Sequence, residues 1–131
     1  MLEAMKKLNK IIQKIIEDIN KVIQCYYEIV PDDTIMPYSV IPPININFLD
    51  ESCKIFYLDI EVYSSKYSSE VIIEDVVEEI IKAINKKNYI LENIGFHINI
   101  EDVNNIPEQE KNITARKITC IVKVMEGGKT L

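Results

Sequence analysis

The feature that most constrains the fold is the run from Cys53 to Tyr63, in which apolar side chains recur at every second residue. Successive side chains of a β-strand point to opposite faces of its sheet, so this run predicts a long strand with one face in the core. The two predicted faces are Phe56, Leu58, Ile60 and Val62 on one side, and Ile55, Tyr57, Asp59, Glu61 and Tyr63 on the other. The chain therefore has to build a sheet around this strand.

Two segments carry the three- and four-residue spacing of apolar positions that is typical of an amphipathic helix. The first runs from Leu2 to Tyr26, and Pro31 prevents its continuation. A coiled coil is the alternative for this segment, but its apolar stripe is too wide for a two-position seam. The second helix follows Ser68 or Ser69, either of which can be its N-cap. Its predicted buried stripe is Ile73, Val76, Val77, Ile80, Ile81 and Ile84.

Shorter alternating runs predict further strands. One covers Met36 to Ile41, and Pro42-Pro43 after it favours a position at the edge of the sheet, because proline donates no backbone hydrogen bond. A second run covers Ile44 to Phe48. Near the C-terminus, Phe96 to Glu101 and Ile113 to Met125 predict an antiparallel pair joined by a long, acidic tip.

These elements follow one another as helix, strand, strand, helix, strand, strand. Two helices packed side by side cover about 20 Å, close to the width of four strands spaced ~4.8 Å apart. The sequence therefore predicts a two-layer α+β sandwich, with both helices on one face of a four-stranded, mainly antiparallel sheet. Residues 1–126 are expected to form this single domain, and residues 127–131 a flexible tail.

The two periodicities together predict a core in which six side chains pack against Ile15 and Ile19: Phe56, Leu58, Ile60, Ile80, Ile84 and Val122. The other face of the sheet is then left uncovered. A contiguous apolar patch on such a face marks a partner site, and aromatic side chains make good anchors there. The candidate interface residues are Ile55, Tyr57, Tyr63 and Ile121.

The balance of acidic and basic residues argues against some classes of function. The 131 residues include 21 acidic and 15 basic side chains, for a net charge of −6. This balance argues against a general basic surface for nucleic acid or an anionic membrane. Charged residues interrupt the apolar runs of the N-terminal segment, so neither a signal peptide nor a membrane-spanning helix is expected. The wide spacing of Cys25, Cys53 and Cys120 favours reduced, buried thiols in a cytosolic protein.

No pattern of residues in the sequence indicates a catalytic or cofactor site. We therefore expect neither an enzyme nor a bound metal, nucleotide or other cofactor. A Cys53 or Cys120 nucleophile with His97 as its base is an alternative, but the alternating pattern around each cysteine favours core packing. Paired carboxylates such as Asp32-Asp33 are interpreted as surface charge. Their alternatives are the acid pair of a hydrolase or a hard-cation site.

A resemblance is carried by the N-terminal helix and five later stretches, which are MPYSVI, KIFYLDIEVYSS, SSEVIIEDVVEEIIKAIN, FHINI and ARKITCIVKVM. Over residues 2–125 this order resembles the tail terminator and tail completion proteins of tailed phages and phage-derived tail-like particles. Members of that family are about this size and are similar mainly in the order of their elements. The resemblance implies a structural protein without catalytic residues.

The resemblance further implies a six-subunit ring at the head-proximal end of a tail tube, where it stops polymerisation of the tube and gives the head or neck a docking surface. Its implied partners are copies of the chain and tail tube, sheath or neck proteins, with no specific nucleic-acid or membrane binding. The implied location is the cytoplasm during assembly, then the virion or tail-like particle.

A lumen that conducts DNA is better lined with acid than with base, because Lys and Arg retain phosphates. The candidates for such a lining are Glu101, Asp102, Glu108 and Glu110, with an ordinary surface loop as the alternative. Two other functions stay open from the sequence. One is another head–tail connector or neck component, and the other is a small cytosolic α+β enzyme or ligand-binding module.

Overall fold

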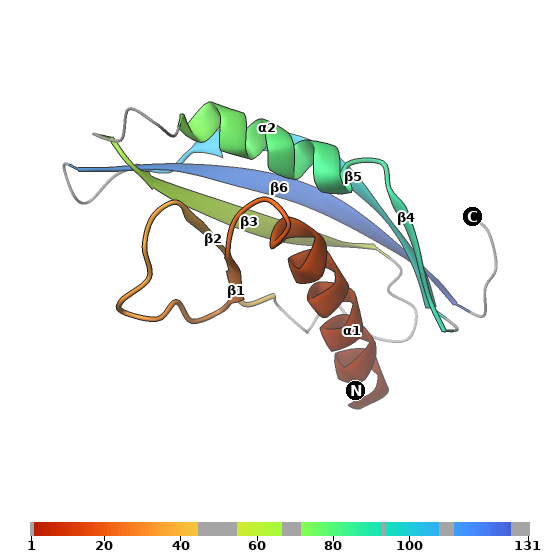
Figure 1. Ribbon diagram of the computed structural model, residues 1–131. Coiled ribbons are helices and arrows are strands. Elements are labelled where there is room, and N and C mark those ends of the chain that lie inside the picture. The colour runs from red at the N-terminus through yellow and green to blue at the C-terminus, as the bar shows by residue number, and fades with distance from the viewer. Residues whose placement is uncertain (1, 45–54, 67–71, 93, 108–111, 127–131) are drawn as a thin grey trace.

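The computed structural model describes residues 2–44, 55–66, 72–92, 94–107 and 112–126 (Figure 1). The helices in this part of the chain are α1 (Leu2–Ile19) and α2 (Ile73–Ile84). The strands are β1 (Cys25–Tyr27), β2 (Tyr38–Ile41), β3 (Ile55–Ser65), β4 (Asn88–Leu91), β5 (Ile94–Asn105) and β6 (Ile113–Glu126).

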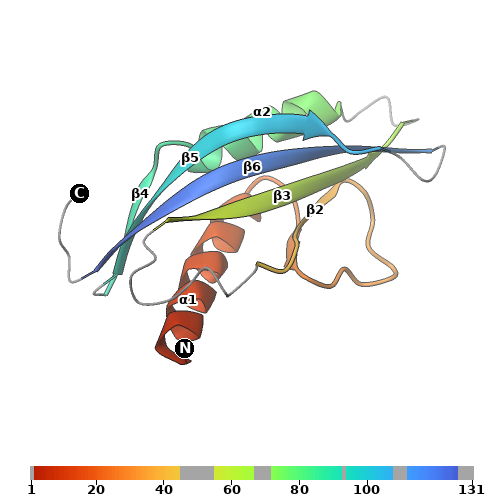
Figure 2. The ribbon, with the colours of Figure 1, turned by 180° about the vertical axis from the view of Figure 1, so that it is seen from behind.

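These strands form one sheet in the order β1-β2-β3-β6-β5-β4. All neighbours are antiparallel except β1 and β2, which are parallel, so the sheet is mixed. The sheet curls into a half-barrel, and both helices lie on the same face of it (Figures 1 and 2). The α+β class and the two helices are as predicted. The four-stranded two-layer sandwich is wrong, because the sheet has six strands and is curled.

Strand β1 was missed because the helical spacing of apolar residues continues to Tyr26. Helix α1 ends at Ile19 instead, and the Asn20 side chain accepts a hydrogen bond from the Cys25 amide at 2.8 Å through Oδ1. This bond turns the chain so that β1 can pair in parallel with β2. Val22 and Ile23 still pack against the core from the turn, which is why their positions fitted a helical stripe.

Strand β4 was missed because it is short. After α2, Lys86 has a left-handed φ of 59°, and its amide donates to the Ile98 carbonyl at 2.7 Å. The following residues therefore form β4, which pairs with β5 at the edge of the sheet.

The prediction that Pro42-Pro43 places the preceding strand at an edge is also wrong. β2 lies between β1 and β3, and the prolines follow its last residue. Their missing N–H groups fit this place, because the pairing of β2 with β3 ends at Val40 and Glu61. Ile44 lies outside the strands, and the rest of the strand predicted from Ile44 to Phe48 falls outside the described residues.

The core lies between the sheet and the two helices. The prediction for its centre is confirmed, since Phe56, Leu58, Ile60, Ile80, Ile84 and Val122 are all at most 3% exposed, and Ile15 and Ile19 are fully buried. Removing an aliphatic side chain of this size from water contributes roughly 1.5–3 kcal/mol to folding. The sheet therefore has one densely packed face, and its other face is free of helices in the described chain (Figure 2).

Helix α2 begins at Ile73, and Ile72 at its N-cap makes no side-chain capping bond. The expected caps, Ser68 and Ser69, lie outside the described residues. Glu74 and Asp75 in the first turn interact favourably with the helix dipole. The predicted stripe is confirmed: Ile73, Val77, Ile80 and Ile84 are buried, and Val76 and Ile81 are half-buried.

Candidate interaction surface

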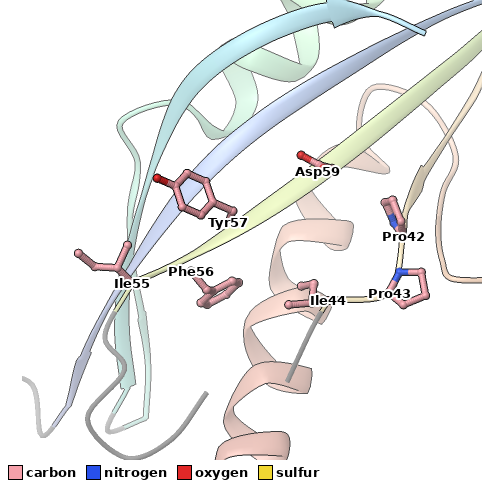
Figure 3. Close-up of a pocket in the computed structure, with 7 residues that line it drawn as sticks. All are labelled: Pro42, Pro43, Ile44, Ile55, Phe56, Tyr57 and Asp59. Carbon is pink, nitrogen blue, oxygen red and sulfur yellow. The ribbon is translucent and has the colours of Figure 1, made fainter. Parts of the chain in front are cut away.

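The helix-free face of the sheet carries a patch of apolar side chains where β3 begins. Ile55 and Tyr57 are 50% and 59% exposed, because odd-numbered residues of β3 point away from the helices. Figure 3 shows Tyr57 and Phe56 on opposite sides of the strand. Ile121 of β6 lies directly opposite Tyr57, and Lys123 lies opposite Ile55. We call these four residues, Ile55, Tyr57, Ile121 and Lys123, the sheet patch.

Tyr63 shares this face but lies apart from the sheet patch. It lies six residues after Tyr57, which is about 20 Å along a strand. Its ring stacks on Tyr38 with centroids 5.4 Å apart, and Tyr26 meets Tyr38 edge-on at 6.5 Å. Its hydroxyl donates to Glu61 at 2.8 Å, and burial, followed by this bond, raises the pKa of Tyr63. Of the four candidate interface residues, Ile55 and Tyr57 are therefore exposed, Ile121 is half-buried beside them, and Tyr63 is a half-buried tyrosine with intramolecular partners.

The two candidate acids within the described residues, Glu101 and Asp102, lie in a strand and not at a tip. Glu101 and Asp102 belong to β5, whose pairing with β6 shifts register between Ile100 and Asp102, so Glu101 is the extra residue of a β-bulge. Both side chains are exposed. Asp102 accepts hydrogen bonds from the Val103 amide at 2.9 Å and from the Asn104 side chain at 3.0 Å. Glu108 and Glu110 lie outside the described residues.

A hollow of about 360 Å³ adjoins the sheet patch where β2 stops pairing with β3 (Figure 3). The described part of its lining is mostly apolar and contains one carboxylate, Asp59, which accepts a hydrogen bond from Thr119 at 3.0 Å. The described lining residues are Pro42, Pro43, Ile44, Ile55, Phe56, Tyr57 and Asp59. The hollow extends the apolar surface of the sheet patch towards the segment after β2.

The alternative pairing of Cys120 with His97 is excluded by the sheet. Cys120 points into the core and is fully buried, and this burial, with the charge of Asp59, raises the pKa of its thiol to about 12. His97 lies on the helix-free face, opposite Lys123, and its Nδ1 is 2.7 Å from Asn88 Oδ1. Core packing is confirmed for Cys120 and for Cys25, both free and buried. Cys53 lies outside the described residues.

The described residues contain neither a candidate metal site nor a candidate membrane-spanning helix. No group of three or more His, Cys, Asp or Glu side chains among these residues is arranged to hold a metal ion. None of the described helices is both long and apolar enough to span a membrane.

One charged residue with several partners was not predicted from the sequence. Asp18 is 2% exposed near the end of α1, and its carboxylate accepts hydrogen bonds from Tyr89 at 2.6 Å, Lys87 at 2.8 Å and Lys21 at 3.3 Å. A charged side chain is not expected in the apolar stripe of an amphipathic helix, so its burial was not predicted. Its spacing of seven residues from Ile11 places it beside the apolar stripe, and this spacing was the available signal.

Comparison with protein-family models and with curated proteins found no match for this chain.

Proposed function

We propose that the chain is a structural assembly protein. Copies of it form a ring that caps the head-proximal end of a phage-type tail tube, stops the polymerisation of the tube and offers a docking surface to the head or neck. The ring has six copies in this proposal, and it passes from the cytoplasm into the virion or tail-like particle.

The sheet patch is the observation that carries the proposal. Ile55 and Tyr57 expose half or more of their surface side by side on β3, next to Ile121. A tyrosine within an apolar cluster buries a large area at low entropic cost, as in the anchors of protein interfaces. The order of elements described above as resembling tail terminators adds support, since that family works through its surfaces.

The first test is the assembly state of the purified protein. We expect a particle of about six chain masses in solution and closed rings by electron microscopy. Tyr57→Asp and Ile55→Lys should each give monomers, because a charge in the centre of an apolar contact loses its hydration. Ile35→Lys is the matched control, since Ile35 is 83% exposed in the segment between β1 and β2, and it should leave the ring intact.

The second test concerns the role of the ring. Cells that assemble the particle without this protein should produce tails that are overlong or not joined to heads. Tails of normal length joined to heads would contradict the terminator function. A monomeric wild-type protein, at every concentration tested, would contradict assembly itself.

A further inference from the structure

The outer face of α2 is acidic. Its acids, Glu74, Asp75, Glu78 and Glu79, are all exposed, and the helix has one lysine, Lys82. Glu74 pairs with Arg116 of β6 at 2.6 Å, so Asp75, Glu78 and Glu79 carry most of the negative charge of this face. Lys82 lies 3.5 Å from Glu78 and 3.6 Å from Glu79, and their charges raise its pKa. Ile72, directly before the helix, is 57% exposed. This face thus combines negative charge with an apolar side chain at one end.

The sheet patch has the complementary character. Lys123 stands opposite Ile55 on one side and His97 on the other, so no carboxylate lies directly across from it in either neighbouring strand. The nearest acid of β3 on this face, Asp59, lies beyond Tyr57 from Ile55 and accepts a hydrogen bond from Thr119 at 3.0 Å, so its negative charge is at the opposite margin of the patch from Lys123. The patch is therefore apolar with a positive charge at its margin, and its opposite face is already covered by helices.

We infer that the sheet patch binds helix α2 of a second copy of this chain. A helix is the element that covers the other face of the same sheet, and Lys123 of the sheet patch is opposite in charge to the exposed acids of α2. The 12 residues of α2 span about 18 Å. The strands from β3 to β4 cover about 14 Å at a spacing of ~4.8 Å, so one helix can cross this region.

The positions of the two surfaces dictate how copies associate. α2 and the sheet patch lie on opposite sides of the sheet, so a pair joined by one contact leaves one free surface at each end (Figures 1 and 2). Such a head-to-tail contact adds copies until the rotation between them closes a ring. The inference rests on the proposed function in that the sheet patch is taken as an assembly surface.

The test reverses charge on α2. Glu78→Lys combined with Glu79→Lys should raise the concentration needed for assembly roughly 100-fold, as for the loss of a central interface contact. Asp32→Lys combined with Asp33→Lys makes the same charge change in the exposed segment between β1 and β2 and should leave assembly unchanged. Adding Lys123→Glu to the α2 variant should restore part of its assembly.

Mixing two variants identifies the contact. A Tyr57→Asp chain keeps an intact α2, and a Glu78→Lys/Glu79→Lys chain keeps an intact sheet patch. Each should be monomeric alone, with an unfolding midpoint close to that of the wild type at concentrations too low for assembly. Together they should form a one-to-one dimer that grows no further, because each dimer has one altered surface at either end.

Three results would overturn the inference. If Tyr57→Asp prevents assembly and the α2 variant still forms rings, the sheet patch binds a different surface, and the proposed function stands. If the two variants do not dimerise when mixed, α2 and the sheet patch are not partners. If the wild-type protein never assembles, the inference and the proposed function fail together.

Discussion

Asp18 is the one charged residue in the core of the described chain. It connects the end of α1 to Tyr89 of β4 and to Lys87, two residues more than sixty positions away in the sequence. Burial opposes ionisation of its carboxyl, but the hydrogen bonds from Lys87, Tyr89 and Lys21, with the charge of Lys87, lower its pKa from 3.8 to about 2. The same hydrogen bond, after burial, raises the pKa of Tyr89. The carboxylate form of Asp18 thus stabilises the fold.

The sign of this effect predicts how stability depends on pH. Because the folded pKa lies below the unfolded value, the stabilisation is complete above about pH 4 and is lost as the pH falls towards 2. The difference corresponds to about 2 kcal/mol in the free energy of unfolding. Urea unfolding of the wild-type protein between pH 6 and pH 2 measures it.

Asp18→Asn isolates this residue. It should lower the free energy of unfolding at neutral pH by about 1–3 kcal/mol, because the buried donors lose a charged acceptor. Its stability should also fall less steeply with acid than that of the wild type. Glu17→Gln is the control, since Glu17 is exposed and pairs only with Lys14 among the described residues, at 3.4 Å. Equal pH profiles for Asp18→Asn and the wild type would contradict the role of Asp18.

At the scale of elements, neighbouring residues of β3 point to opposite faces of the sheet. Leu58 is 1% exposed in the core, and Tyr57 is 59% exposed on the helix-free face. Leu58→Ala should therefore lower the free energy of unfolding by about 2–5 kcal/mol, from the lost burial and the cavity that remains. At concentrations too low for assembly, Tyr57→Ala should change it by less than about 0.5 kcal/mol. Similar losses for both variants in urea unfolding would contradict the assignment of the faces.

The sequence predicted an element well where its apolar residues follow a single strand or helix spacing throughout, as in β3 and α2. The prediction failed where contacts between distant residues determine where an element ends. The Cys25 amide donates a hydrogen bond to the Asn20 side chain just after α1, and the chain then forms β1. Val22 and Ile23 nevertheless continue the apolar spacing of a helix. β5 was expected to end at Glu101 because its alternation breaks there. The bulge absorbs one residue, so Val103 pairs opposite Ile118 and the strand continues to Asn105.

The residues of the candidate surface were also predicted in part, where alternation along one strand was sufficient. Alternation was enough to place Ile55, Tyr57 and Ile121 on one face. It could not show that Tyr63 stacks on Tyr38, because that contact depends on the register between β2 and β3. Lys123 was missed for the same reason, since its place beside Ile55 follows from the register of β6.

At the scale of the whole molecule, charge is distributed unevenly over a chain with a net charge of −6. In the proposed ring, acids that face the lumen repel the phosphates of passing DNA, and the exposed pair Glu101 and Asp102 is the described candidate for this lining. Asp32 and Asp33 are equally exposed but lie between β1 and β2, so they offer a comparison with the same change in charge.

Glu101→Gln with Asp102→Asn should leave the ring assembled and increase the amount of DNA that it retains at low salt. Retention should fall as salt rises, because binding to phosphates depends on the release of counterions. Asp32→Asn with Asp33→Asn should retain no more DNA than the wild type. Retention is measured by the mobility of double-stranded DNA mixed with purified rings over a salt series. If both double variants retain DNA equally, the effect belongs to net charge and Glu101 and Asp102 do not line the lumen. If neither differs from the wild type, acids at these positions do not act on DNA.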